Sequence, residues 1–188
     1  MLHIAVVLIC LLVRSTLSLA TRQGVGTAPE KLDFRTLKNG VYRLRLCAIW
    51  PRCLDFEEYI GFRNKTCSKK YGPILRDFSD SRNWKSWKLE FSNKTQSSAQ
   101  VTIQMYYPKK PQPRCEEAYI TPAKSELYLS QKDREIFSLR LADEYDCVNI
   151  VHENRVFAAS QDCNDLRVGL AKPDPDSDLQ RWRLIKVA

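Results

Sequence analysis

The sequence predicts an all-β protein. No stretch of the 188 residues keeps the helical period of apolar side chains that marks an amphipathic helix. Short segments instead alternate apolar and polar residues, and Pro, Gly, Asn, Asp or Ser separates one segment from the next. Because alternation places one face of a strand in a core and the other in water, each segment is predicted to be a strand.

Twelve such segments follow one another along the chain. The predicted strands cover residues 41–49, 53–58, 73–78, 84–91, 99–107, 116–122, 126–131, 136–142, 147–153, 156–161, 166–172 and 180–187.

Every fourth predicted strand carries an aromatic residue, one intervening residue and a leucine. The three pairs are Trp87/Leu89, Phe137/Leu139 and Trp182/Leu184, so the pattern recurs after 50 and then 45 residues. Both members of a pair are expected to face the core. A unit of four strands cannot bury its apolar face alone, so three units are predicted to close around a shared axis as a β-trefoil. A β-sandwich is the alternative, but it does not require threefold recurrence.

The N-terminus has the pattern of a secretory signal peptide. The apolar run from Ile4 to Val13 is too short to span a bilayer, and the small residues Ser18 and Ala20 precede the expected cleavage point. A membrane anchor is the alternative for this run. We expect residues 1–20 to be the signal peptide, 21–36 a flexible tail, and 37–188 a single domain that is secreted, extracellular and without a membrane span.

Cysteine usage agrees with secretion. Seven cysteines become six when Cys10 leaves with the signal peptide, and six are predicted to form three disulfides in an oxidising compartment. If residues 154–155 form a hairpin turn, Cys147 lies close to Cys163 across it. For the other four cysteines we favour Cys53–Cys67 and Cys47–Cys115 among three possible pairings. Scattered spacing argues against a metal site.

Two further features bear on a secreted protein. Sequons for N-linked glycosylation occur at Asn64 and Asn93, each in a polar stretch where a loop is expected. Basic residues also interleave with aromatic ones, and the formal net charge is +8. This charge favours an anionic partner such as a sulfated glycan or an acidic protein surface, and secretion argues against nucleic acid. The alternative is that the cations simply face outward on half-buried strands.

The residues needed for catalysis are sparse. His152 is the one histidine outside the signal peptide, and an ordinary surface imidazole is the favoured interpretation of it. Neighbouring residues in a strand point to opposite faces, so the pairs at 57–58 and 116–117 cannot act as coupled carboxylates. No glycine-rich phosphate loop occurs. We therefore expect a protein that is not an enzyme and has no cofactor or metal.

Two short motifs resemble those of the ricin B-type β-trefoil lectins. One is Cys53-Leu54-Asp55-Phe56 and the other is Gln180-Arg181-Trp182. The resemblance implies a glycan-binding site in the first unit, with Asp55 accepting sugar hydroxyls, Phe78 stacking on the sugar and Asn83 adding a hydrogen bond. The chain departs from the pattern, because no single unit holds both motifs. Within the Gln-x-Trp motif, we expect Trp182 to be a core residue and Gln180 to satisfy nearby backbone.

Other secreted proteins of the same architecture supply alternatives. Residues 32–46 resemble the opening of the Kunitz-type soybean trypsin inhibitors, which implies a protease inhibitor whose loop would present Lys109, Lys110 or Arg114. A receptor-directed or heparin-binding effector is the third possibility, by architecture alone. The favoured prediction is a secreted binding protein for glycans or for a glycosylated or acidic extracellular protein.

Overall fold

The computed structural model describes residues 31–47, 58–62, 72–77, 86–106, 118–142, 146–162 and 166–187. These ranges belong to one compact unit, Lys31–Ala188. They contain strands and two short 3-10 helices, η1 (Phe34–Thr36) and η2 (Asp178–Gln180). None of the helices in the described ranges is long and apolar enough to cross a membrane.

Twelve strands occur in the described residues, as the alternation predicts. They are β1 (Gly40–Leu46), β2 (Glu58–Phe62), β3 (Pro73–Asp77), β4 (Trp87–Ser92), β5 (Ser98–Met105), β6 (Tyr119–Ala123), β7 (Glu126–Ser130), β8 (Phe137–Leu141), β9 (Cys147–His152), β10 (Arg155–Ala159), β11 (Val168–Ala171) and β12 (Trp182–Lys186).

The second strand lies further along the chain than the alternation predicts. The predicted segment 53–58 overlaps β2 at Glu58 alone. Residues Glu58, Tyr59 and Ile60 are all buried, so the part of this strand whose burial is described shows no alternation. Alternation of apolar and polar residues therefore could not locate β2, and the predicted strand ends where the observed one begins.

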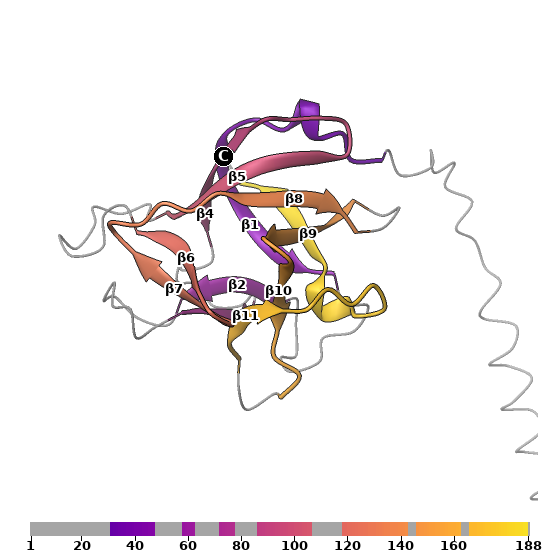
Figure 1. Cartoon of the computed structure of the whole chain (residues 1–188). Helices are drawn as coiled ribbons and strands as arrows, with labels where there is room; N and C mark the ends of the chain where they lie inside the picture. The colour runs from indigo at the N-terminus through magenta and orange to yellow at the C-terminus, as the bar shows by residue number, and fades with distance from the viewer. Residues whose placement is uncertain are drawn as a thin grey trace, which may run out of the picture. The chain divides into compact units, whose positions relative to one another are not determined.

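Six of the strands form a closed ring of antiparallel pairs. Around the ring, β1 pairs with β4, β4 with β5, β5 with β8, β8 with β9, β9 with β12, and β12 with β1. The remaining strands form the hairpins β2–β3, β6–β7 and β10–β11, and Figure 1 shows labelled strands of all three at one end of the ring. Closure leaves the ring without a free edge. Each successive set of four strands thus gives its first and fourth strands to the ring and its middle two to a hairpin.

The recurring aromatic residues lie in the core, as predicted. Trp87, Phe137 and Trp182 are fully buried, and Lys88, which follows the first of them, is exposed. Trp87 Nε1 donates a hydrogen bond to the carbonyl oxygen of Ile60 at 2.9 Å. Trp182 Nε1 donates in the same way to Phe157 at 3.2 Å, so each indole joins a ring strand to the second strand of its own set.

The folded unit begins before residue 37, the boundary expected from the sequence. The side chain of Phe34 is fully buried in the core, and its backbone N–H donates to Gln96 O at 3.3 Å. Asp33 caps η1 by accepting a hydrogen bond from the N–H of Arg35. The prediction of a flexible tail is therefore wrong for residues 31–36, because their polar composition hid one core residue. The predicted signal peptide and residues 21–30 lie outside the described residues.

Within the described residues, one disulfide, Cys47–Cys147, joins the residue that follows β1 to the first residue of β9, and its Cα atoms are 6.4 Å apart. It contradicts two predicted pairings, Cys147–Cys163 and Cys47–Cys115. The hairpin turn is one residue earlier than expected, since His152 pairs with Arg155, and Cys147 pairs with Arg183 of β12 rather than across the β9–β10 hairpin.

The start of β12 brings these two cysteines together. Cys47 donates its N–H to Arg181 O at 2.9 Å, and Cys147 pairs with Arg183. Strand order in the ring therefore determines the partner of Cys147. The predicted pair Cys53–Cys67 lies outside the described residues.

Removing the disulfide should destabilise the protein. For the double substitution Cys47→Ser and Cys147→Ser we expect the free energy of unfolding to fall by about 2–5 kcal/mol, because the bond closes a long loop in the unfolded chain. Urea denaturation of the oxidised proteins measures this. After full reduction the two proteins should unfold alike, and a Cys147–Cys163 peptide in non-reducing mapping would contradict the assignment.

Candidate binding site

Most of the candidate residues predicted from the sequence lie outside the described residues. They are Asp55, Phe78 and Asn83 of the lectin-like site, Asn64 of the first sequon, and Lys109, Lys110 and Arg114 of the inhibitor-like loop. The structure does not test these predictions. The second sequon residue, Asn93, is described, and it is exposed in the loop after β4.

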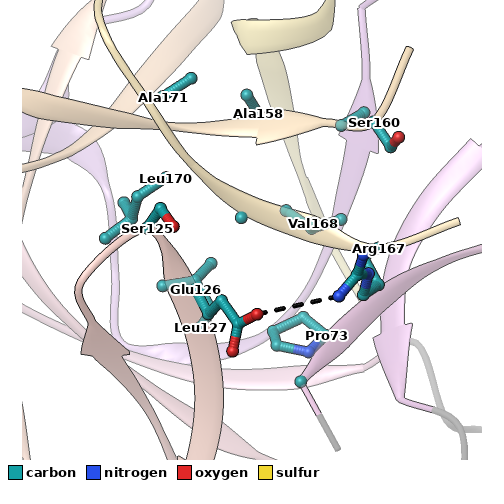
Figure 2. Close-up of a pocket in the computed structure, with 13 residues that line it drawn as sticks. Pro73, Ser125, Glu126, Leu127, Ala158, Ser160, Arg167, Val168, Leu170 and Ala171 are labelled. Atoms are coloured by element: carbon teal, nitrogen blue, oxygen red, sulfur yellow. Dashed lines mark ion pairs between the residues drawn. The ribbon is translucent and has the colours of Figure 1, made fainter. Parts of the chain in front are cut away.

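A hollow of about 360 Å³ lies where the three hairpins meet (Figure 2). Its wall comes from the start of β3, the turn between β6 and β7, and strands β10 and β11. The lining residues are Gly72, Pro73, Ser125, Glu126, Leu127, Ala158, Ala159, Ser160, Arg167, Val168, Gly169, Leu170 and Ala171.

Backbone hydrogen bonds hold the hairpins together around the hollow. Lys124 begins the β6–β7 turn with a left-handed φ of 56°, and Ser125 O accepts a hydrogen bond from Leu170 N at 2.8 Å. Leu75 N of β3 donates to Leu166 O, just before β11, at 2.7 Å. The β6–β7 turn and β3 are therefore both fixed against the β11 segment.

Glycine is required where these hairpins approach closely. A Cβ atom on Gly72 would lie 2.1 Å from Leu127 O, and one on Gly169 would lie 2.9 Å from Ser125 O. Both contacts are with backbone oxygens, which cannot rotate away as side chains do. The two glycines therefore determine how tightly the hairpins pack around the hollow.

The rim of the hollow is charged, and its large apolar lining residues belong to the core. Glu126 Oε1 lies 3.8 Å from Arg167 Nη1, and both side chains are largely exposed (75% and 68%). Figure 2 shows this pair joined by a dashed line, with Pro73 beside it. Leu127, Val168 and Leu170 are buried beneath. Because an exposed ion pair contributes little to stability, a ligand can replace this contact at little cost.

His152, the single histidine outside the predicted signal peptide, lies away from the hollow on β9. Its ring packs against that of Phe137, with centroids 5.7 Å apart. Its Nε2 atom lies 3.8 Å from Glu135 Oε2, and about a fifth of the side chain is exposed (21%). Packing against a core aromatic residue is the environment of a structural histidine.

The Gln-x-Trp motif is used inside the fold, as predicted. Gln180 is 6% exposed; its Nε2 donates to Lys172 O at 2.9 Å, and its Oε1 accepts from Asp174 N at 2.8 Å. The side-chain amide of Gln180 thus pairs with one backbone N–H and one backbone carbonyl of the loop before η2. The side chain of Trp182 is buried in the core. Neither residue is available to contact a ligand.

Comparison with known proteins gives matches in structure and none in sequence. No protein-family model and no curated protein matches the chain. Three similar solved structures are Cry35Ab1 (TM-score 0.55, 14% identity), a GlcNAcα1-4Gal-releasing endo-β-galactosidase from Clostridium perfringens (0.53, 9%) and ThreeFoil, a designed 3-fold symmetric protein (0.52, 15%).

Coverage differs among the three. The matches span 84%, 80% and 79% of this chain, but 37% of Cry35Ab1, 34% of the endo-β-galactosidase and 99% of ThreeFoil. The chain therefore spans about a third of the length of the first two and nearly all of the designed protein. At these identities the likeness is one of fold.

The sequence reasoning missed the hollow because its residues come from three separate hairpins. One indication was present. Gly169 interrupts an otherwise apolar strand, and an isolated glycine in a strand often marks a close backbone approach. Nothing in the sequence pairs Glu126 with Arg167, which are joined only by the hairpin contacts.

The structural role of Gln180 can be tested directly. For Gln180→Ala we expect a loss of about 1–3 kcal/mol in the free energy of unfolding, because Lys172 O and Asp174 N lose buried partners. Thermal or urea denaturation measures the loss. Binding of any glycan by the folded variant should match wild type, and a selective loss of binding would show that the motif contacts a ligand.

The glycine contacts give a graded prediction. Gly72→Ala should cost about 1–3 kcal/mol, since the added Cβ meets a backbone oxygen and the hairpins must move apart. Gly169→Ala should cost less, because its predicted contact is longer. Equal stability of both variants and wild type in urea denaturation would contradict the packing described here.

Proposed function

We propose that the chain is a β-trefoil that acts as a secreted glycan-binding protein without enzymatic activity. The closed ring of six strands and the three hairpins support the fold assignment, since each set of four strands repeats the same pairing. Likeness to a designed 3-fold symmetric protein over nearly its whole length supports it further. The extracellular location is supported by the disulfide.

The observation that carries the functional proposal is the composition of the hollow between the hairpins. A sugar presents hydroxyl groups around its edge and apolar C–H faces, so it suits a site with a few fixed polar groups above an apolar floor. Glu126, Arg167 and Ser125 supply the polar groups, and the half-buried Ala158 and Ala171 supply apolar surface. A volume of about 360 Å³ suits one or two sugar units.

Binding without hydrolysis is favoured by the charges of this site. Glycoside hydrolysis uses two carboxyl groups that flank the scissile bond. Among the described residues that line the hollow, Glu126 is the single carboxylate, and its nearest charged partner is a guanidinium group. One of the structures with a similar fold is an enzyme that releases GlcNAcα1-4Gal, which adds support to glycans as the ligand class.

The resemblance to the lectins places a second candidate site at Asp55, Phe78 and Asn83. The two sites predict different effects of substitution, so one experiment separates them. The proposed partners are glycans or a glycosylated or acidic extracellular protein.

The test is a glycan array that includes sulfated polysaccharides, probed with the secreted protein. If the hollow binds, Glu126→Gln and Arg167→Gln should each weaken binding to the best glycan by about tenfold or more, the loss expected for a charged hydrogen bond. Glu153→Gln, at the exposed turn between β9 and β10 and not among the residues that line the hollow, is the matched control and should bind as wild type does.

The outcomes distinguish the alternatives. If Asp55→Ala loses glycan binding while Glu126→Gln binds as wild type does, the binding site is the lectin-like one at Asp55 and not the hollow. An array without hits overturns glycan binding altogether.

A further inference from the structure

We propose that Asn93 carries an N-linked glycan and that its first sugars cover a second hollow, beside β4, β5 and the segment that leads into β8. This inference concerns a modification of the chain itself; it rests on the secretion proposed above and not on glycan binding by the first hollow.

The acceptor side chain is exposed and presented by a short loop. Asn93-Lys94-Thr95 is a complete sequon between the end of β4 at Ser92 and the start of β5 at Ser98, and residues 92–97 are all exposed. Asn93 adopts a left-handed φ of 46°, which asparagine tolerates better than most residues. The modification therefore needs no rearrangement of a strand.

The donor of the glycan is an oligosaccharide linked to a lipid through a diphosphate. The Asn93 Nδ2–C1 bond forms while the C1–O bond to the diphosphate breaks; the lipid diphosphate leaves with the bonding electrons, and one Nδ2 proton passes to solvent. The second amide proton stays on Nδ2. It can therefore still serve the hydrogen bond that Nδ2 donates to Gln100 Oε1, at 2.5 Å.

This hydrogen bond directs the glycan onto the outer face of the sheet. Gln100 lies opposite Ser92 in the β4–β5 pair and opposite Ser138 in the β5–β8 pair. Its neighbours Ala99 and Val101 face the core, so Gln100 faces outward with Thr102. The Asn93 amide is thus held over the outer surface of these three strands.

A hollow of about 320 Å³ lies on the same face, next to the sequon. It is lined by Asn39, Glu90, Phe91, Ser92, Thr102, Arg134 and Ile136. Ser92 is the residue directly before Asn93. Ile136 is 55% exposed, and it is one of two large apolar residues that the described part of the chain leaves exposed.

The charged groups beside the hollow are fixed in place. Glu90 accepts hydrogen bonds from Lys88 Nζ, at 2.9 Å, and from Arg134 Nη2, at 2.5 Å. The Lys88 hydrogen bond lowers the pKa of the Glu90 carboxyl, and Arg134 lowers it further. The guanidinium of Arg134 also lies 5.6 Å from the ring centroid of Tyr119. Glu90 therefore stays ionised and positioned for sugar hydroxyl groups.

The hollow accordingly offers what a sugar requires, an aliphatic surface at Ile136 beside ordered polar groups at Glu90 and Arg134. A glycan attached one residue away has a high local concentration at this surface, so weak contacts suffice to hold it there. The occupant we assign to the hollow is the glycan of Asn93, and it would cover the exposed side chain of Ile136.

Modification is tested by intact mass analysis of the full chain, with its own N-terminal segment, secreted from eukaryotic cells. We expect Asn93→Gln and Thr95→Ala each to remove one glycan relative to wild type. Thr95→Ser keeps both the sequon and a hydroxyl for the loop's hydrogen bonds, so it should keep the glycan. A wild-type chain that is not secreted, or is secreted with position 93 unmodified, overturns the proposal.

Placement of the glycan is tested separately by hydroxyl-radical footprinting before and after enzymatic removal of N-linked glycans. Labelling of Ile136 should rise when the glycan is removed, in proportion to the area uncovered. Val187, the other exposed large apolar residue among those described, is 46% exposed and lies on no wall of this hollow, so its labelling should not change. Unchanged labelling of Ile136 on a chain that carries the glycan overturns its placement over the hollow.

Discussion

Pairing of β12 with both β1 and β9 closes the ring, and the other features of the fold depend on this closure. It buries Trp182, whose indole reaches the carbonyl of Phe157 and so ties the ring to β10. The same strand brings Cys47 and Cys147 to their bonding distance. The three hairpins are carried by the ring strands and meet at one end of the ring. The hollow at their junction therefore depends on the pairing of β12 with β1 and β9.

The parts of the structure that were predictable from the sequence are those governed by local periodicity. Trp87, Phe137 and Trp182 could be assigned to the core because each lies in an alternating strand. The partner of Cys147 could not be predicted, because it depends on strand order around the ring and because a turn misplaced by one residue shifts the register of a hairpin. The predicted boundary of the N-terminal tail was wrong at Phe34 for a related reason. A single buried side chain in a polar stretch produces no periodic pattern of apolar residues.

The candidate site was less predictable than the fold. Glu126 and Arg167 belong to different hairpins and meet only through contacts that involve Gly72, Gly169 and Ser125. The Gln-x-Trp motif drew attention to Gln180, which is fully occupied by backbone groups. A motif shared with a family of binding proteins can therefore mark the end of a structural unit, while the residues that line the proposed site show no recognisable sequence pattern.

Lys94, the middle residue of the Asn93 sequon, has a consequence for the way the chain is assembled. Its ammonium group donates hydrogen bonds to the carbonyl oxygens of Arg35 and Leu37. These bonds hold the β4–β5 loop against the segment that leads into β1. The side chain of Phe34 is buried in the core, and its backbone N–H donates a hydrogen bond to the carbonyl oxygen of Gln96 in the same loop. A cut or an insertion between residues 93 and 97 would thus release the chain's entry into the domain, so the loop is a poor place to attach a tag even though it is exposed.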